Sequence, residues 1–546
     1  MVRIKSFALC LLLSLTVTSC APSREETRPI SENSQNFSFE KHLDISIGYW
    51  NIDGMAKATQ PDPLTEYIES LFNITIHPVP VTWSNYKERY QILSATDSLP
   101  DVFATVTISS NDNNDSSTFI EMIETGSIRA LPVDLSPWPS IETLMESVSY
   151  TKYSDGCFYA LPRFSFTDAS LGSTDAAMLV RRDWMETLGL SDPQSFQEFA
   201  DLAAAFANHD PDGNGIHDTI GYNVNSLNAL GKWVILGIDP PSNVYSWIEK
   251  DGLFIPSWTT ENFKDVIVAY RELYTSGGLD PAFYSKSPTI VIDDFASGRL
   301  GLLEYKSSPS SLMEIKQKWD AINDKPFEEC VDVLPIFPTK QGIRYSNSSN
   351  VFWSESFISS SADDEKVERI LSLFEFLLSE EGIRMGSYGL EGIDYVKQED
   401  GTYECLLNTE GEGLATVLCR KYPSIAMFNA IASWGGGWED FEVNELNNLR
   451  YGKACVELGR KSALWNQANT VPLTRSYAFL LTPKESTDIF STANALEAMI
   501  NCIIGTEDPI IMWDNYLNQL YDNGFSDYIQ RQNDSYFENQ VKKERD

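Results

Sequence analysis

The sequence has few of the groups that proteins use for nucleophilic catalysis or for binding transition metals. Only 4 histidines occur among its 546 residues, and none of its 8 cysteines lies in a Cys-x-x-Cys pair. This composition argues against a zinc site. No Gly-x-Ser-x-Gly, His-Glu-x-x-His or Cys/His arrangement is present. The familiar hydrolase motifs are therefore missing. With 78 acidic residues, however, the composition does not exclude a pair of catalytic carboxylates.

Positive charge is also scarce. The chain carries 41 Lys and Arg against 78 Asp and Glu, which gives a formal net charge of -37. Such a surface repels nucleic acid and anionic lipid headgroups, so we expect no nucleic-acid partner. The same argument favours an uncharged ligand over an acidic one, unless a local basic cleft reverses it.

Long apolar runs are absent except for one short stretch near the amino terminus. Arg3 and Lys5 precede the apolar residues 7–17, and small residues then lead to Cys20. The stretch is about half the length of a membrane-spanning helix, and the pattern is typical of an export signal. An ordinary secretory signal followed by a chance cysteine is the alternative.

The segment Val17-Thr-Ser-Cys20 resembles the lipobox of bacterial lipoproteins. The resemblance implies cleavage of a signal peptide, residues 1–19, and lipidation of Cys20. A polar tether, residues 20–40, would then hold the protein on the extracellular face of the cytoplasmic membrane through its lipid anchor. Six cysteines would remain in the body, and either disulfides or buried thiols fit them.

The body of the chain is too long for one ordinary core, so we expect at least two lobes. Near its start, strand-like and helical patterns alternate. Such alternation predicts a parallel sheet covered by helices, an α/β fold. The segments are strands at 43–50, 74–81 and 101–104, with helices at 64–72 and 86–95.

Several short segments, taken in order, resemble the solute-binding proteins of bacterial ABC importers, in their large sugar-binding, Gram-positive branch. The segments are Ser98–Phe103, Asp155–Pro162, Val180–Gly189, Phe295–Gly301 and Ser379–Tyr395. The resemblance implies a two-lobed, periplasmic-binding-protein-like α/β fold with a hinge and a ligand cleft between the lobes. We place lobe one at 41–168 and 306–378, and lobe two at 169–305 and 379–546.

An acidic loop, Asp210-Pro-Asp-Gly-Asn-Gly-Ile-His-Asp218, has the oxygen spacing of the first part of an EF-hand. An all-oxygen shell suits a hard cation, although position 12 is Gly221 instead of a bidentate glutamate. Relatives that the motifs resemble carry a similar loop that binds Ca²⁺ structurally. The predicted ligands are Asp210, Asp212, Asn214, the Ile216 carbonyl and Asp218; a turn without metal is the alternative.

Thirteen tryptophans supply the flat apolar surfaces on which sugar rings stack, and nearby acids could accept hydrogen bonds from hydroxyls. Several follow predicted strands at the ends where open α/β sheets bind ligands. Each tryptophan could equally be a core residue. The predicted ligand-binding residues are Trp50, Asp53, Trp83, Trp233, Tyr305, Trp353, Glu355, Glu391 and Trp434.

These features together predict a monomeric, lipid-anchored protein that captures a carbohydrate and delivers it to ABC permease subunits, and that is not an enzyme. Two other functions fit the sequence. One is a sensory or adhesive lipoprotein that has kept the fold, and the other is a surface enzyme that acts on glycosides. The sequence does not identify the sugar.

Overall fold

The computed structural model describes residues 39–52, 61–108, 116–166, 168–227, 230, 232–240, 246–347, 352–410, 412–434, 437–473 and 488–545. The predicted signal peptide, lipidation site Cys20 and nearly all of the tether lie outside these residues, as does Asp53. Among the described helices, none is long and apolar enough to cross a membrane.

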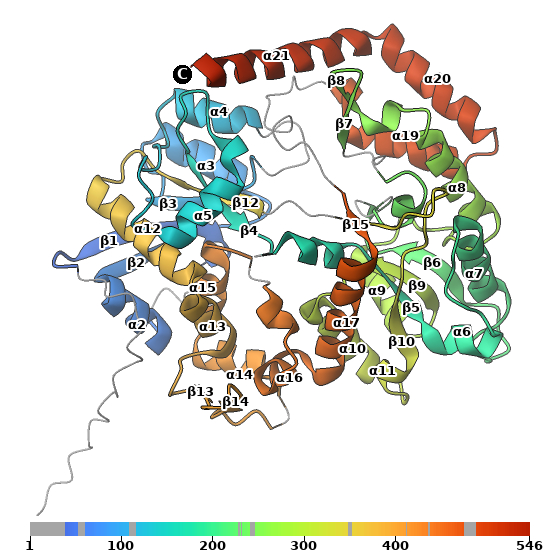
Figure 1. Cartoon of the computed structure of the whole chain (residues 1–546), viewed down its shortest axis with the longest axis horizontal. Helices are drawn as coiled ribbons and strands as arrows, with labels where there is room; N and C mark the ends of the chain where they lie inside the picture. The colour runs from blue at the N-terminus through green and yellow to red at the C-terminus, as the bar shows by residue number, and fades with distance from the viewer. Residues whose placement is uncertain are drawn as a thin grey trace, which may run out of the picture. The chain divides into compact units, whose positions relative to one another are not determined.

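Two separate sheets, each covered by helices, form the two lobes (Figure 1). The first sheet has the strand order β2-β1-β3-β12-β4. Its strands are β1 (Leu43–Trp50), β2 (Ile74–Val81), β3 (Val102–Thr105), β4 (Ala160–Phe164) and β12 (Phe352–Ile358). β1 pairs in parallel with β2 and β3, which confirms the predicted parallel unit. β12 runs antiparallel to both its neighbours, so the sheet is mixed.

The second sheet has the order β10-β5-β9-β6 and is also mixed. Its strands are β5 (Ala177–Arg181), β6 (Ile220–Val224), β9 (Leu300–Tyr305) and β10 (Val331–Leu334). Three small two-stranded sheets complete the β-structure of the described residues. They are β7 (Trp247–Lys250) with β8 (Leu253–Pro256), β13 (Tyr395–Lys397) with β14 (Tyr403–Cys405), and β11 (Tyr345–Ser346) with β15 (Val471–Pro472).

Most helices of the first lobe bury one apolar face, whereas α12 is buried on nearly all sides, and side-chain caps mark where several of them begin. Asp62, for example, accepts hydrogen bonds from the backbone N–H groups of Leu64 and Thr65 at the start of α2. The helices are α2 (Pro63–Phe72), α3 (Tyr86–Ala95), α4 (Ser116–Glu124), α5 (Pro139–Ser147), α12 (Asp364–Leu378), α13 (Glu380–Tyr388), α14 (Leu414–Lys421), α15 (Ile425–Ile431) and α16 (Glu445–Tyr451).

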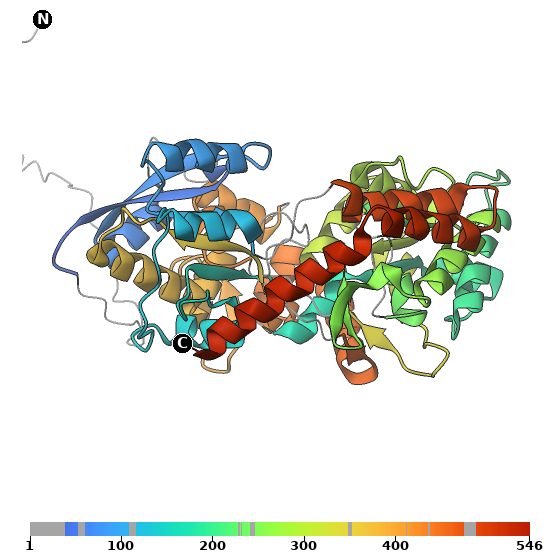
Figure 2. The same ribbon diagram turned by 90° about the horizontal axis from the view of Figure 1, so that it is seen from above.

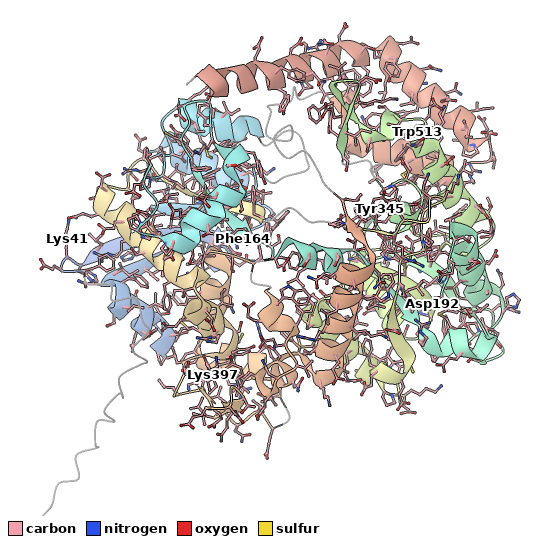
Figure 3. All side chains as sticks on the ribbon, viewed as in Figure 1. Lys41, Phe164, Asp192, Tyr345, Lys397 and Trp513 are labelled. Carbon is pink, nitrogen blue, oxygen red and sulfur yellow. The ribbon has the colours of Figure 1, made fainter. Side chains whose placement is uncertain are left out.

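The second lobe contains the remaining described α-helices, and α19 and α20 lie along one side of it (Figure 2). Side chains fill its interior, and Trp513 of α20 and Asp192 belong to this lobe, whereas Phe164 belongs to the first (Figure 3). The helices are α6 (Arg182–Leu188), α7 (Phe196–Asn208), α8 (Phe263–Thr275), α9 (Pro288–Ala296), α10 (Pro309–Asp320), α11 (Phe327–Cys330), α17 (Lys453–Asn469), α19 (Thr492–Ile504), α20 (Pro509–Asp522) and α21 (Phe525–Arg545).

The chain divides between the lobes differently from the predicted boundaries. Residues 306–378 were expected in lobe one; β12 and α12 do belong to it, but β10 pairs with β5 in the second sheet. Residues 379–546 were expected in lobe two; α19 and α20 do pack in the second core, but the buried side chains of α13 to α16, such as Met385, Phe428 and Leu446, belong to the first core. The periodicity of an amphipathic helix specifies an apolar face but not the sheet that the face covers.

The six described cysteines are free thiols. Cys330, Cys455 and Cys502 are buried, Cys157 and Cys405 are partly buried, and Cys419 is exposed. Of the two alternatives, the structure supports free thiols, three of them buried, for the body of the chain.

Candidate ligand-binding site

Four tryptophans from distant parts of the chain gather at one end of the first sheet. We call Trp50, Trp83, Trp353 and Trp434 the tryptophan platform. Trp50 stacks on Trp83 with ring centroids 4.0 Å apart and an interplanar angle of 9°. The Trp434 ring centroid lies 6.3 Å from those of Trp50 and Trp83, and 5.2 Å from that of Trp353. All four are predicted ligand-binding residues, and the fold brings them together.

The four rings of the platform differ in how much of their surface is exposed to a ligand. Trp83 and Trp353 are 46% and 42% exposed, whereas Trp50 is 1% exposed. Trp434 is partly buried. Because Trp50 has no free face, its role is to support Trp83 from below. The exposed rings present apolar faces of the size that suits a sugar ring.

An irregularity in β12 turns Trp353 outward. The register of β12 against β4 shifts between Phe352 and Glu355, and Ser354 between them has a positive φ of 75°. The flanking Phe352 and Glu355 are buried while Trp353 is exposed. Bulges and strained backbone of this kind are common beside binding sites because they redirect a single side chain.

Arg163 of β4 lies fully buried beneath the platform. Its guanidinium carbon is 4.2 Å from the Trp434 ring centroid and 4.7 Å from that of Tyr49. It donates hydrogen bonds to the Tyr49 hydroxyl and Ser354 Oγ, both at 2.8 Å, and to the Ala430 carbonyl. Burial lowers the pKa of Arg163 to about 10, so it remains charged at neutral pH. The hydrogen bonds of this one side chain thus connect β1, β12 and the end of α15.

Hydrogen bonds also fix the Trp434 ring. Its Nε1 donates to the Trp353 carbonyl at 2.6 Å and to Ser354 Oγ at 3.0 Å. Since Ser354 also accepts from Arg163, the orientation of Trp434 depends on the bulge and on the buried arginine together.

A cavity of about 810 Å³ adjoins the platform. Phe352, Trp353 and Trp434 line one part of it, and polar residues line the rest. This combination of aromatic surface with a few charged and amide groups is typical of small-molecule sites. The polar lining includes Asp175, Lys232, Lys306, Ser308, Ser310, Ser311, Asn347, Asn429, Glu439, Asp440 and Arg450.

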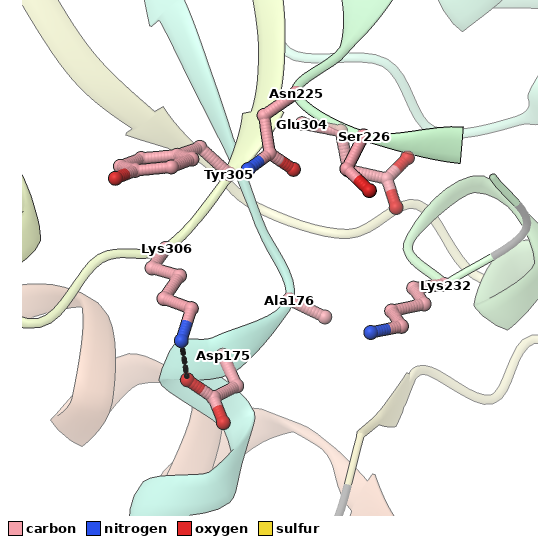
Figure 4. A pocket seen from close by; sticks show the side chains of 8 residues that line it. All are labelled: Asp175, Ala176, Asn225, Ser226, Lys232, Glu304, Tyr305 and Lys306. Atoms are coloured by element: carbon pink, nitrogen blue, oxygen red, sulfur yellow. Dashed lines mark ion pairs between the residues drawn. The ribbon is translucent and has the colours of Figure 1, made fainter. Parts of the chain in front are cut away.

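A smaller cavity of about 160 Å³, which we call the crossing pocket, shares Asp175, Lys232 and Lys306 with the larger one. Tyr305, another predicted residue, lines this pocket, and its hydroxyl donates to Glu314 Oε2 at 2.7 Å. Figure 4 shows the side chains of Lys232 and Lys306 pointing toward the space beside Asp175 and Ala176. Asn225, Ser226 and Glu304 complete the lining.

Two of the remaining predicted residues are core residues instead. Trp233 is 3% exposed, and its ring packs against Phe199 and Phe337 in the second core. Glu355 is fully buried and accepts hydrogen bonds from Thr107 Oγ1 at 2.6 Å and from the Ile108 N–H at 2.9 Å. Both were predicted to contact the ligand, but in the fold each stabilises its own lobe.

Glu391 is exposed in the segment before β13 and lines neither of the two cavities. Asp53 lies outside the described residues. The sequence interpretation missed Arg163, although a basic residue inside the apolar strand 160–164 is a signal that could have found it. It also missed Lys232, Lys306, Glu439 and Arg450, which no motif marks.

The backbone of the acidic loop turns tightly at its two glycines. Gly213 and Gly215 have positive φ angles, as does Asp210. The Asn214 amide Nδ2 donates to Asp212 Oδ2 at 2.7 Å and to Asp218 Oδ1 at 3.3 Å, so both carboxylates face one position. Burial and the neighbouring Asp210 and Asp218 carboxylates raise the pKa of Asp212.

Asp210 Oδ1 is a buried oxygen without a hydrogen-bond partner among the described residues. A converging set of carboxylates with an orphaned oxygen fits a hard cation. Within the same residues, however, no three acidic, histidine or cysteine side chains gather tightly enough to hold a metal ion by themselves. The predicted set also needs the Asn214 amide and the Ile216 carbonyl.

Comparisons with known proteins agree with this architecture. No protein-family model matches the chain. Lipoprotein LipO of Bacillus subtilis strain 168 is 24% identical over 374 residues, which cover 65% of this chain and 70% of the relative. The polygalacturonan/rhamnogalacturonan-binding protein YtcQ of the same organism is 23% identical over 348 residues, 63% of this chain and 66% of the relative.

Solved structures match nearly the whole chain at low identity. The alginate-binding protein AlgQ2 without calcium ion has a TM-score of 0.63 and 16% identity, and the match covers 91% of this chain and 98% of that one. An EF-hand mutant of the Streptococcus pneumoniae ABC-transporter substrate-binding protein FusA, in complex with fructo-nystose, has a TM-score of 0.61 and 16% identity over 92% of this chain and all of that one. The resemblance inferred from the sequence motifs is thus confirmed, and the chain has the two-lobed fold of the solute-binding proteins of bacterial ABC transporters.

Proposed function

We propose that this protein binds an oligosaccharide in the cavity beside the tryptophan platform and delivers it to the permease subunits of an ABC importer. The observation that carries the proposal is the exposed Trp353 ring, which lines the polar cavity together with Trp434 and has the exposed Trp83 ring beside it. Sugar rings stack on such faces, and their hydroxyls bond to nearby acids and amides.

The names of the relatives support this function. YtcQ is a polygalacturonan/rhamnogalacturonan-binding protein, and FusA is an ABC-transporter substrate-binding protein solved with fructo-nystose. LipO is named a lipoprotein, which supports a lipid anchor at Cys20 and a place on the extracellular face of the membrane. We propose further that the protein acts as a monomer and has no enzymatic activity.

Replacing Trp434 by alanine is expected to weaken glycan binding about 30-fold. The change removes one stacking surface and the Nε1 hydrogen bonds that fix the platform, which together correspond to about 2 kcal/mol. The measurement is isothermal titration of the purified protein with a panel of oligosaccharides, after thermal-shift screening has identified one that binds.

Tyr521→Ala is the matched control, because Tyr521 is a 44% exposed aromatic residue on α20 that lines neither cavity. It should bind the same glycan as tightly as the unmodified protein does. Equal affinities for all three proteins would place the glycan elsewhere. Hydrolysis of the glycan during the titration would contradict a pure binding function and favour an enzyme.

We also propose that the acidic loop binds one Ca²⁺ through Asp210, Asp212, Asn214, the Ile216 carbonyl and Asp218. Neighbours with the same fold include a calcium-free form of AlgQ2 and an EF-hand mutant of FusA, which supports a cation site in such proteins. When bound, the ion would neutralise neighbouring carboxylates and stiffen the loop between α7 and β6.

Removal of calcium with EDTA is expected to lower the melting temperature of the protein by about 3 °C, since a ligand that binds only the folded state stabilises it. Asp212→Asn should remove this dependence. Differential scanning calorimetry with CaCl₂ and with EDTA measures both effects.

Asp400→Asn provides the control. Asp400 also caps a tight turn, where it accepts hydrogen bonds from Thr402, but it lies at the β13–β14 turn in the other lobe. This variant should keep the full response to calcium. A wild-type protein that melts at the same temperature with and without calcium would identify the loop as a turn without metal.

A further inference from the structure

One exposed ring of the tryptophan platform lies outside both cavities. Trp353 and Trp434 line the cavity of about 810 Å³, whereas Trp83 lines neither this cavity nor the crossing pocket. Trp83 is nevertheless 46% exposed, the largest exposed fraction among the described tryptophans. A large aromatic surface that stays in water beside a binding site is a candidate for a further contact with the ligand.

The Trp83 ring rests on a buried base. Trp50 stacks on it at 4.0 Å with an interplanar angle of 9°, and Trp50 itself is 1% exposed. Tyr86 packs nearby in a T-shaped arrangement, with ring centroids 6.2 Å apart. Because Trp50 covers one face of the Trp83 ring, the exposed surface lies on the side that faces away from Trp50. This side is flat, apolar and supported from below.

The backbone that carries Trp83 is also fixed. The Thr82 N–H donates to Asn85 Oδ1 at 2.8 Å. The N–H groups of Asn85 and Tyr86 donate to the Thr82 carbonyl at 3.2 and 3.0 Å. The turn therefore holds the ring in place before any ligand arrives, which reduces the entropy that binding would cost.

Trp353 connects this surface to the cavity. It lines the cavity, and its ring centroid lies 5.6 Å from that of Trp83 at an interplanar angle of 37°. A cavity of about 810 Å³ is of the size that encloses a small molecule, so a longer glycan must leave it. A chain that leaves past Trp353 meets the Trp83 ring next. The aromatic surface is thus continuous from the cavity to the outside.

The surroundings of Trp83 favour a sugar over an apolar protein surface as its partner. Single exposed apolar residues are common and need no ligand, but Trp83 continues an aromatic surface that begins inside the cavity. Along the chain its exposed neighbours are polar, so no wider apolar patch extends from it on that side. These neighbours are Thr82, Ser84, Asn85, Lys87 and Glu88.

We infer that Trp83 forms an additional subsite outside the cavity, on which a sugar unit of a protruding chain stacks, and that this subsite makes the protein prefer longer oligosaccharides. The inference rests on the proposed carbohydrate function and adds to it the length of the ligand. Trp83 determines specificity for chain length and not for the kind of sugar, because stacking uses an apolar ring face that many sugars share.

The test is isothermal titration of the purified protein with three series of probes, from disaccharide to heptasaccharide. They are malto-oligosaccharides, inulin-type fructo-oligosaccharides and α-1,4-linked galacturono-oligosaccharides. In a series that binds, affinity should rise with length. Trp83→Ala should weaken binding of the longest chains roughly tenfold and leave that of the shortest bound chain unchanged. Trp353→Ala should weaken binding of chains of every length, because Trp353 lines the cavity.

Two further variants separate stacking from support of the fold. Trp83→Leu keeps an apolar contact with Trp50 but has no flat ring, so it should bind glycans as Trp83→Ala does. Trp83→Phe keeps a ring and should retain most of the gain with length. Tyr284→Ala is the control, because Tyr284 is a 44% exposed aromatic residue that lines neither cavity.

Three results would overturn the inference and leave the carbohydrate function standing. One is an unmodified protein whose affinity does not rise with length. Another is an equal loss for chains of every length in Trp83→Ala and Trp83→Leu, which would make the ring part of the cavity site. The third is unchanged binding of every chain by these variants, which would leave the ring to a protein partner. Failure of all three series and of every oligosaccharide in the panel to bind would overturn the carbohydrate function, and with it the inference.

Discussion

Arg163→Met is expected to lower the free energy of unfolding of the first lobe by about 4 kcal/mol and to abolish detectable glycan binding. Methionine fills much of the same space but donates no hydrogen bond. Tyr49, Ser354 and the Ala430 carbonyl would therefore lose a charged donor in a buried place. Leaving a buried acceptor without its donor typically costs about 1–3 kcal/mol, and three acceptors are affected here. Urea denaturation followed by tryptophan fluorescence measures the change.

The loss of binding follows from the same contacts. Ser354 connects Arg163 to the Trp434 indole, and the guanidinium also lies against that ring. Without the arginine, the bulge that exposes Trp353 loses the hydrogen bond to Ser354, and the Trp434 ring loses the guanidinium that packs against it. Arg163→Lys tests the geometry separately, because an ammonium keeps the charge but cannot bridge three acceptors in one plane. It should be less stable than the unmodified protein and more stable than Arg163→Met.

Arg420→Ala is the control for this experiment. Arg420 is 63% exposed and pairs with Glu412 on the surface, so its removal should change stability by less than about 1 kcal/mol. An Arg163→Met protein that unfolds within 1 kcal/mol of the original would contradict the role assigned to the buried guanidinium.

The tryptophan platform was largely predictable from the sequence, and the reason is local. Trp50 ends β1, Trp83 follows β2, and Trp353 lies in β12. Side chains at the carboxyl ends of the parallel strands β1 and β2 meet at one edge of the sheet. Because β12 runs antiparallel to β3, its start, with Trp353, lies at the same edge. Trp434 follows α15 in a loop and does not lie in a strand. It was predicted because the glycine-rich sequence after it contains little that could bury an indole.

The same reasoning failed where the answer depended on packing between distant segments. Trp233 also follows a loop, but Phe199 of α7 and Phe337 beyond β10 enclose it. Lys232, next to it in sequence, faces the cavity instead. Nothing in a single sequence specifies which of two adjacent residues points inward when the element is a short loop. The predicted lobe boundaries were wrong in part for a related reason, because α13 to α16 pack on the first core although they follow it far along the chain.

Gly221→Ala is expected to destabilise the second lobe by roughly 3–5 kcal/mol. A Cβ atom at this position would lie 2.0 Å from the Ala203 carbonyl oxygen and 2.5 Å from that of Gly278. Both obstacles are backbone atoms, so α7 would have to move away from β6 to make room. Denaturant unfolding of the variant measures the loss, and a change below about 1 kcal/mol would contradict this close packing.

Gly413→Ala provides the control, because a Cβ there would lie 3.4 Å from its nearest neighbour, the Leu449 carbonyl oxygen. That variant should lose less than about 1 kcal/mol.

The same contact explains a feature of the acidic loop that the sequence left open. Position 12 of an EF-hand supplies a bidentate glutamate, and here that position is Gly221. Because β6 passes against α7 at this residue, no side chain fits. Gly221→Glu should therefore unfold the second lobe instead of raising its affinity for calcium, and calorimetry with CaCl₂ separates these results. A folded Gly221→Glu protein that binds calcium more tightly would show that the loop can close as a complete EF-hand.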